Sequence, residues 1–288
     1  MAEPGRPEDR TIMTDKGYTD PRFIVSAAEL ASGLDGAHLI DVRSGEEFAS
    51  GHIAGARHFD LYGLSLNDTA EAPLNAFLWM IETLFGFHGV TDGAPVVVYD
   101  HESGERAARA VWLLDFLGHQ DVRLLDGGLP AWRRHGGAVT QEAEPGKRLD
   151  WQGTRAMDRL ATRFDVHAAI GDPACVLVDV RRDTEVDGTE KRARRVGTIP
   201  GARHIDWRRH LDADGAYLPA DEVRALYQSE GVTPDKTIIP YCQGGYRSAS
   251  TALVLRMLGY PDVRNYLGSW WEWGNRDDSV IVLNGEDA

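Results

Sequence analysis

The chain has 288 residues, about twice the length of a typical domain, which predicts two domains. Its composition, 42% apolar and 26% charged, is that of a globular protein and excludes a mainly disordered, collagenous or coiled-coil chain. The formal net charge of −14 disfavours nucleic acid and acidic membrane surfaces as partners.

The chain carries no sign of export or of a bound cofactor. The first 22 residues are polar, lack the apolar centre of a secretion signal, and are expected to form a flexible tail. No apolar run is long enough to cross a membrane. The two cysteines, Cys175 and Cys242, are too few for a disulfide framework and lack zinc-site spacing. Together with the absence of nucleotide-binding motifs, this predicts a reduced, cytoplasmic protein without metal or cofactor.

The sequence repeats itself along its length. Ordered matches recur with a period of about 140 residues, which is too long for a solenoid and indicates a duplicated domain. The matches are LIDVR at 39–43 with LVDVR at 177–181, GARH at 55–58 with GARH at 201–204, and VVVYD at 96–100 with IIPYC at 238–242.

Both copies share one order of elements. An apolar, strand-like run at 96–99 or 237–241 is followed by a polar loop and then by a helical pattern at 106–118 or 250–260. Strands that alternate with helices predict an α/β fold in which helices flank a mainly parallel sheet. We therefore expect two tandem domains of this kind, at 23–140 and 160–288, joined by a linker at 141–159.

Cys242 ends the strand-like run of the second copy and begins a glycine-rich loop. Such a junction directs backbone N–H groups and the positive end of the following helix into the loop. Gly244 and Gly245 allow a tight turn, and Arg247 adds a positive charge. A cysteine in this setting is expected to have a lowered pKa and to exist largely as thiolate. The loop therefore suits attack on an electrophilic sulfur or phosphorus atom carried by an anion.

The other cysteine and the first copy differ from this arrangement. Asp100 stands in the first copy where Cys242 stands in the second, so the first copy has no nucleophile there. Cys175 lies among apolar neighbours with no glycines or cations close by, and is predicted to be a core residue.

These motifs together resemble the tandem rhodanese-domain sulfurtransferases, the thiosulfate and 3-mercaptopyruvate sulfurtransferase family. The resemblance rests on DVR followed by GHIAGARH, the cysteine loop, and the trailing LLDGGLPAW and YLGSWWEW, and it covers about 23–275. It implies that Cys242 takes a sulfane sulfur from a small anionic donor as a persulfide and passes it to cyanide or a thiol, including a possible protein thiol. It also implies that the first domain is catalytically silent. The candidate substrate-binding residues are Gln243, Gly244, Gly245, Tyr246, Arg247 and Ser248 in the loop, with Arg181 and Arg182 after the preceding strand.

The chain departs from both familiar subtypes at the donor-binding positions. Thiosulfate-type members have two basic residues directly after the cysteine, where this chain has Gln243 and Gly244. Mercaptopyruvate-type members have a serine at the position of Gly244, and their Asp and His partners find no clear match. The substrate arginine of familiar members falls on Glu185. Thiosulfate remains the favoured donor over 3-mercaptopyruvate.

An insertion in the second copy concentrates positive charge. It contains Lys191, Arg192, Arg194 and Arg195. Such a run is either a solvated surface loop or a basic rim that attracts an anionic donor to an otherwise acidic protein.

Two alternative functions stay open from the residues. A cysteine-dependent phosphatase of the same fold would have five residues between cysteine and arginine, whereas four separate Cys242 from Arg247. A non-catalytic module that binds a sulfur-carrier or redox protein would not need a loop that activates a thiol.

Overall fold

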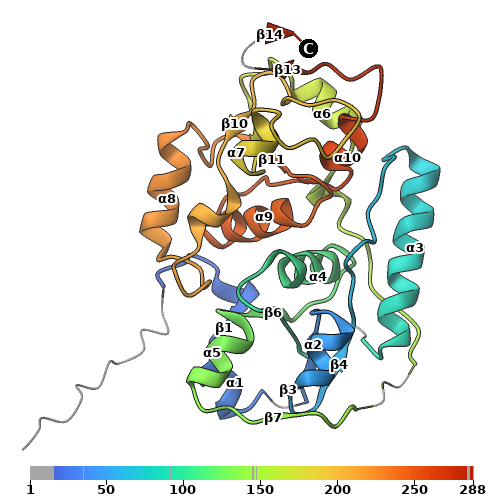
Figure 1. The fold of residues 1–288 in the computed structure, drawn as a ribbon, viewed down its shortest axis with the longest axis vertical. Coiled ribbons are helices and arrows are strands. Elements are labelled where there is room, and N and C mark those ends of the chain that lie inside the picture. Colours follow the sequence, from blue (N-terminus) through green and yellow to red (C-terminus); the bar gives the residue numbers. More distant parts are fainter. Residues whose placement is uncertain are drawn as a thin grey trace, which may run out of the picture.

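The computed structural model describes residues 16–34, 36–90, 93–144, 146, 148–283 and 286–287. Residues 1–15 of the expected tail lie outside this part. The described chain forms two stacked α/β domains (Figure 1), domain 1 from the first repeat and domain 2 from the second. None of the helices in the described ranges is long and apolar enough to cross a membrane.

Domain 1 is built on a five-stranded parallel sheet in the order β1-β6-β5-β2-β4. Its central strand β5 is buried along its whole length, as expected for a parallel strand covered on both faces. The strands are β1 Ile24–Val25, β2 His38–Asp41, β3 His52–Ile53, β4 Ala56–His58, β5 Val96–Tyr99, β6 Val122–Leu125 and β7 Val139–Thr140. The helices are α1 Ala27–Ser32, α2 Gly45–Ser50, α3 Glu71–Phe87, α4 Glu105–Phe116 and α5 Gly128–Arg134.

Domain 2 repeats this arrangement. Strands pair in the orders β10-β9-β11 and β12-β8, and a parallel bridge between Ile238 and Val263 joins the two groups beside β12. The strands are β8 Leu160–Ala161, β9 Cys175–Asp179, β10 Arg203–His204, β11 Thr237–Tyr241, β12 Asn265–Tyr266, β13 Val282–Leu283 and β14 Glu286–Asp287. The helices are α6 Arg163–Ala169, α7 Asp183–Val186, α8 Ala220–Ser229, α9 Arg247–Met257 and α10 Ser269–Trp273.

The two domains match in detail as well as in strand order. Tyr99 and Tyr241 end the central strands, and each hydroxyl accepts a hydrogen bond from a backbone N–H of the same domain, Ile53 at 3.0 Å and Ile199 at 3.1 Å. Asp100 and Cys242 therefore occupy equivalent positions, one residue past the central strand. The α/β fold class and the tandem arrangement predicted from the repeats are confirmed.

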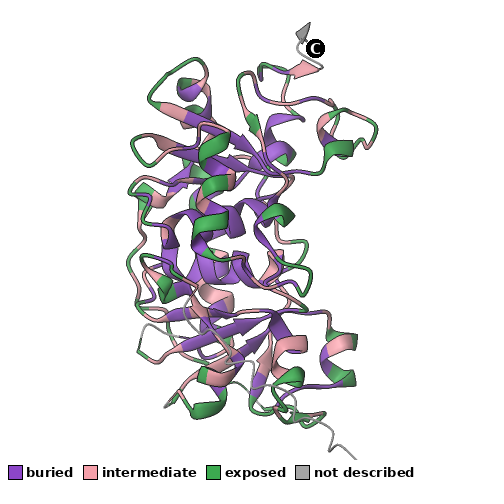
Figure 2. Cartoon of the chain, turned by 90° about the vertical axis from the view of Figure 1, so that its left-hand side faces the viewer, coloured by how far each residue is buried: buried purple, intermediate pink, exposed green. Residues whose placement is uncertain are grey.

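Helices α4 and α9 form the centre of the domain interface, where they pack against each other. All residues of α4 from Ala107 to Phe116 are buried, and Arg256 is the one residue of α9 that is not. Both helices lie inside the purple band in the middle of Figure 2. A helix buried on nearly every side has no polar face, which explains why most residues of both helices are small or apolar. Gly259, with φ +88°, ends α9 as its sequence predicts.

Residues 16–22 join the domains instead of forming part of a flexible tail, which corrects the sequence prediction for these positions. Lys16 pairs with Asp126 of domain 1, and its carbonyl accepts the N–H of Ala220 in domain 2 at 2.8 Å. The Tyr18 hydroxyl donates to the carbonyl of Leu218 at 2.7 Å. Residues 16–22 therefore make contacts with both domains.

Candidate active site

Cys242 is buried and lines a pocket between the two domains. Loop residues of domain 2 form one wall, and residues of domain 1, including the equivalent loop after β5, form the opposite wall. The pocket is lined by Tyr62, Gly63, Ser65, Asp100, His101, Glu102, Gly104, Glu105, Arg106, Arg182, Glu190, Arg192, Trp207, Arg208, Cys242, Gln243, Gly244, Tyr246, Arg247 and Trp271.

The sulfur of Cys242 is surrounded by hydrogen-bond donors. The N–H of Gly245 donates to Sγ at 3.1 Å, and the hydroxyl of Ser248 lies 3.6 Å away. Burial raises the pKa of the thiol, but the charge of Arg247 and hydrogen bonds from Ser248 and the Gly244 backbone outweigh it, so the pKa lies below its ordinary value. Hydrogen-bond donors of the loop therefore face the sulfur, and the thiolate form of Cys242 stays a prediction.

The start of α10 holds the loop in place from behind. The N–H of Cys242 donates to the hydroxyl of Ser269 at 3.1 Å, and the N–H of Trp270 donates to the Cys242 carbonyl at 3.0 Å. Trp271 donates in the same way to Gln243 at 2.7 Å. Ser269 has φ +51°, a conformation that costs energy for a residue with a side chain. The chain is strained where it fixes the cysteine loop.

Side chains of domain 1 lie very close to the two glycines of the loop. A side chain on Gly244 would meet the Ser65 hydroxyl at 2.9 Å. Gly245 has φ +82°, and a side chain there would meet both the carbonyl of Leu267 at 2.7 Å and the guanidinium of Arg109 at 2.8 Å. The predicted need for glycine thus has two causes, backbone conformation and the closeness of the other domain.

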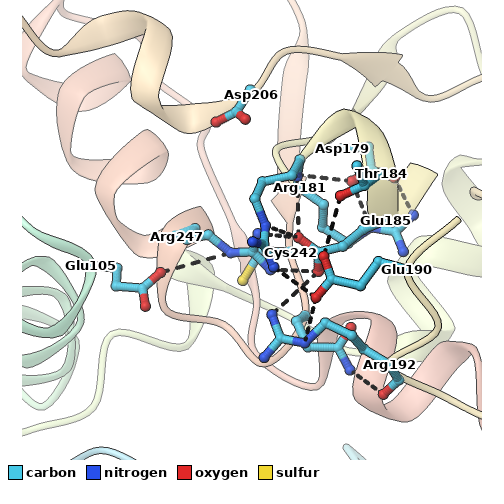
Figure 3. A network of polar contacts seen from close by, with 12 residues as sticks. Glu105, Asp179, Arg181, Thr184, Glu185, Glu190, Arg192, Asp206, Cys242 and Arg247 are labelled. Atoms are coloured by element: carbon cyan, nitrogen blue, oxygen red, sulfur yellow. Dashed lines mark hydrogen bonds and ion pairs between the residues drawn. The ribbon is translucent and has the colours of Figure 1, made fainter. Parts of the chain in front are cut away.

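Arg247 is buried and bound to a carboxylate. Its Nη1 donates to Glu185 Oε2 at 2.5 Å and its Nη2 to Oε1 at 2.9 Å (Figure 3). The sequence predicted a loop cation available to a donor, whereas the structure balances its charge with Glu185. Glu105 of domain 1 lies further off, 3.8 Å from Nε.

The two arginines after β9 have separate places. Arg181 is buried, makes two hydrogen bonds to Asp179 at 2.9 and 2.6 Å, and donates to the Gly197 carbonyl at 2.7 Å. It is absent from the described lining of the pocket, so its proposed donor contact has no geometric support. Arg182 does line the pocket and pairs with Glu190 at 2.8 Å.

The basic residues of the insertion also differ in whether they reach the pocket. Arg192 lines the pocket, with Nη1 3.5 Å from a carboxylate oxygen of Glu185. Arg194 pairs with Asp277, and Arg195 donates to the carbonyl of Ser279 at 2.9 Å, so both hold the C-terminal segment. Lys191 is exposed. One residue of the predicted basic rim, Arg192, therefore reaches the pocket among those described.

Sequence reasoning missed the contribution of domain 1. Asp100 and Cys242 line the same pocket because the two equivalent loops face each other. Burial raises the pKa of Asp100 to about 6, against a smaller opposing effect of the His101 N–H. The sequence repeat could have predicted this arrangement, since two related loops that meet at one domain interface can line a shared cavity.

Cys175 lies at the start of β9, outside the pocket lining as described. It packs against the apolar cluster that includes Leu177 and Ile239, but it is only partly buried. Its Sγ lies 3.6 Å from a carboxylate oxygen of Asp172. Burial and this carboxylate raise the pKa of the thiol. The predicted core position is thus correct in its packing and wrong in its degree of burial.

Two α/β repeats (Figure 1) with a buried cysteine at the pocket between them define a protein of tandem-domain architecture. A family model described as the rhodanese-like domain matches residues 26–135 and 162–276. The chain belongs to the rhodanese family and is a sulfurtransferase.

Several relatives support this assignment. A thiosulfate sulfurtransferase of Pseudomonas aeruginosa is 34% identical over 92% of this chain and 99% of its own length. The sulfur carrier protein TtuD of Thermus thermophilus is 33% identical over 94% of this chain and 100% of its own length. An anaerobic ergothioneine biosynthesis enzyme from Chlorobium limicola shares the fold, with a TM-score of 0.80 at 21% identity over 91% of this chain and 70% of that one.

Proposed function

We propose that Cys242 is the nucleophile of the enzyme and carries the transferred sulfur as a persulfide, while domain 1 is catalytically silent. The observation that carries this proposal is the position of Sγ, buried in the loop and 3.1 Å from the N–H of Gly245. A thiolate held by backbone donors is a ready nucleophile, and the same donors stabilise the negative charge of a persulfide.

The proposed reaction needs no reactant beyond the Cys242 thiolate, thiosulfate and a nucleophilic acceptor. The Cys242 thiolate attacks the sulfane sulfur of thiosulfate, a new S–S bond forms, and the original S–S bond breaks with its electron pair leaving on sulfite. A nucleophile such as cyanide or a thiolate then attacks the outer sulfur. The persulfide S–S bond breaks, thiocyanate or a new persulfide leaves, and the Cys242 thiolate returns.

Thiosulfate is the proposed donor in preference to 3-mercaptopyruvate. The pocket presents Arg106, Arg182, Arg192 and Arg208 in addition to Arg247. Carboxylates pair with them, among others Glu190 with Arg182 and Glu102 with Arg208, but five guanidinium groups stand at the approach to the thiol. A dianion gains more from such surroundings than a monoanion does. Relatives named thiosulfate sulfurtransferase support the same choice over the phosphatase and binding-module alternatives.

A protein thiol is a further proposed acceptor besides cyanide and small thiols. The pocket lies open between the domains, and partly exposed aromatic rings of Tyr62 and Trp271 stand at its edge. A relative called a sulfur carrier protein supports exchange with protein partners. Two unpaired cysteines and a polar chain support a location in the reducing cytoplasm.

Intact-mass spectrometry after incubation with thiosulfate tests the proposal. The wild type and a Cys175→Ser variant should each gain one sulfur atom, lose it on addition of cyanide, and form thiocyanate. Cys242→Ser should gain none and form no thiocyanate, because a hydroxyl cannot hold a sulfane sulfur. Loading that persists in Cys242→Ser and disappears in Cys175→Ser would place the nucleophile at the other cysteine.

A further inference from the structure

A buried arginine of domain 1 reaches across the interface to the cysteine loop. Arg109 projects from α4 and is 0% exposed. Its Nη1 donates to the carbonyl of Gly244 at 2.5 Å, and its Nη2 donates to the carbonyl of Leu64 at 2.8 Å. Its guanidinium carbon lies 4.1 Å from the ring centre of Tyr246, in position for a cation–π contact.

The charge of Arg109 lacks a carboxylate partner, unlike that of comparable arginines. The other buried arginines of the described chain, Arg43, Arg181 and Arg247, each pair with a buried carboxylate. No ion pair to Arg109 occurs within the described residues, and its Nε has no hydrogen-bond partner there. An uncompensated buried cation is costly, so a buried Arg109 without a carboxylate partner points to another anion close by.

The anion is connected to Arg109 through one peptide unit. The carbonyl of Gly244 accepts from Arg109, and the N–H of the same peptide, on Gly245, donates to Cys242 Sγ. A donor on the carbonyl side polarises a peptide and strengthens its N–H as a donor. Burial lowers the pKa of Arg109, and Tyr246 and Cys242 oppose part of this effect, so Cys242 lies close enough to act on the charge of Arg109.

We propose that Arg109 is a positioning residue for sulfur transfer: it fixes the Gly244–Gly245 peptide with its N–H on Cys242 Sγ, and its charge stabilises the anionic sulfur. Arg109 is not among the residues described as lining the pocket, so it acts through the peptide and its field and not through contact with the donor. The inference rests on the proposed role of Cys242 and gives the silent domain a part in the chemistry.

Other charged groups also face the sulfur or its pocket and bear on any pH dependence. They are Arg247 with Glu185 and Glu105, and the pocket residues Asp100, His101, Glu102, Arg106, Arg182, Glu190, Arg192 and Arg208. All of them stay unchanged when Arg109 alone is replaced, so a comparison of variants isolates its effect.

The test measures the rate of Cys242 alkylation by iodoacetamide against pH, in a Cys175→Ser background with one thiol. Arg109→Met removes the charge and both hydrogen bonds, and should slow alkylation at pH 7 about tenfold by raising the pKa of the thiol. The pH profile of thiosulfate kcat/KM should move to higher pH while KM changes little. Arg109→Lys should fall between Arg109→Met and the wild type, because an ammonium keeps the charge without the planar fork.

Arg256→Met is the matched control. Arg256 belongs to the same interface and pairs with Asp115 at 2.5 Å, while Arg159 also binds that carboxylate. It lies nine residues along α9 from Arg247, roughly 13 Å away. Its replacement should lower stability without moving the alkylation profile. Equal shifts in the control and in Arg109→Met would show a general effect of a weakened interface and overturn the proposal.

An unchanged alkylation profile in folded Arg109→Met also overturns it. If that variant does not fold, Arg109→Gln supplies the same comparison. If neither neutral variant folds, wild-type behaviour of Arg109→Lys decides against the proposal, because one ammonium cannot replace both hydrogen bonds and the contact with Tyr246. Alkylation reads the thiol directly, so this result does not depend on whether Cys242→Ser loses sulfur transfer.

Discussion

The guanidinium of Arg247 forms a two-bond ion pair with Glu185, and both side chains are buried beside Cys242. By the resemblance to familiar sulfurtransferases, Glu185 falls at the position of their substrate arginine, so an anion stands beside the loop where a cation was expected. Burial raises the pKa of Glu185, but Arg247 and Arg182 outweigh this and bring it to about 2. The loop therefore presents a balanced pair, and its affinity for anions depends on the surrounding arginines.

Glu185→Gln should increase kcat/KM for thiosulfate by about fivefold to tenfold, because the released charge of Arg247 meets a dianion in a low-dielectric site. The gain for the monoanion 3-mercaptopyruvate should be smaller. Loss of the buried pair should also lower the free energy of unfolding by about 3 kcal/mol. Steady-state kinetics with both donors and urea unfolding measure these effects.

Glu190→Gln is the control for this substitution. Glu190 lines the same pocket and pairs with Arg182, but it is more exposed than Glu185. The same change of charge there should alter kinetics less, since solvent screens it. Equal gains in the two variants would show that total pocket charge, and not the pair with Arg247, governs donor binding.

Arg247→Ala should cut kcat/KM for thiosulfate by roughly tenfold to a hundredfold. Two effects act together: the pKa of Cys242 rises when the adjacent charge is lost, and the Glu185 carboxylate is left facing the donor. Arg247→Lys should recover part of the loss, since it restores the charge but not both bonds to the carboxylate. Unchanged kinetics in Arg247→Ala with both donors would remove Arg247 from the site and leave the backbone donors as the main partners of the anion.

The sequence predicts those features of the fold and site that repeat or follow the chain locally. The duplicated motifs define two α/β domains, and the strand–loop–helix order places Cys242, Gly244 and Gly245 where the structure has them. Each of these follows from the strand before and the helix after it. The order of strand, loop and helix along the chain is therefore enough to predict the position of the cysteine loop.

The features that the sequence could not predict depend on contacts between distant segments. Glu185 and Arg247 are separated by 62 positions, and Arg109 and Gly244 by 135. Arg109 shares its helical pattern with Arg106 and Asp115, and from the sequence alone each of these charged residues resembles a surface position. The burial of Arg109 follows only from the packing of α4 on α9. Contacts between distant segments therefore decide which arginine pairs with a carboxylate and which does not.

Asp100→Cys should not create a second sulfur-accepting site. The new thiol would occupy the position equivalent to Cys242, but its loop carries Glu102 and Glu105 on the pocket side, and their charges raise the pKa of a nearby thiol. Intact-mass spectrometry of Asp100→Cys in a Cys242→Ser background should show no sulfur uptake from thiosulfate within the time that loads the wild type. Rapid sulfur uptake at residue 100 would show that backbone donors alone are enough to activate a thiol at this position.

Asp100 also predicts a pH dependence of stability. Burial raises the pKa of its carboxyl from 3.8 to about 6. The native state therefore holds a proton that the unfolded chain has released, and stability falls as pH rises from about 4 through 6. Asp100→Asn keeps the shape and can still accept the His101 N–H, which lies 2.7 Å from Oδ1. The variant should exceed the wild type in free energy of unfolding by about 3 kcal/mol at pH 8 and come close to it near pH 4.

Urea unfolding at pH 4, 6 and 8 checks this expectation. Asp214→Asn serves as the control, because the Asp214 side chain is 70% exposed and its charge is well solvated. Its stability should follow the wild type at every pH. Parallel stability curves for Asp100→Asn and the wild type across this range would mean that the carboxyl ionises in the native state as easily as in the unfolded chain. In that case the carboxylate of domain 1 would already be ionised opposite Cys242 near pH 5, where a pKa of about 6 keeps it mostly protonated, and the approach of a dianionic donor at that pH would depend still more on Arg182, Arg192 and Arg208.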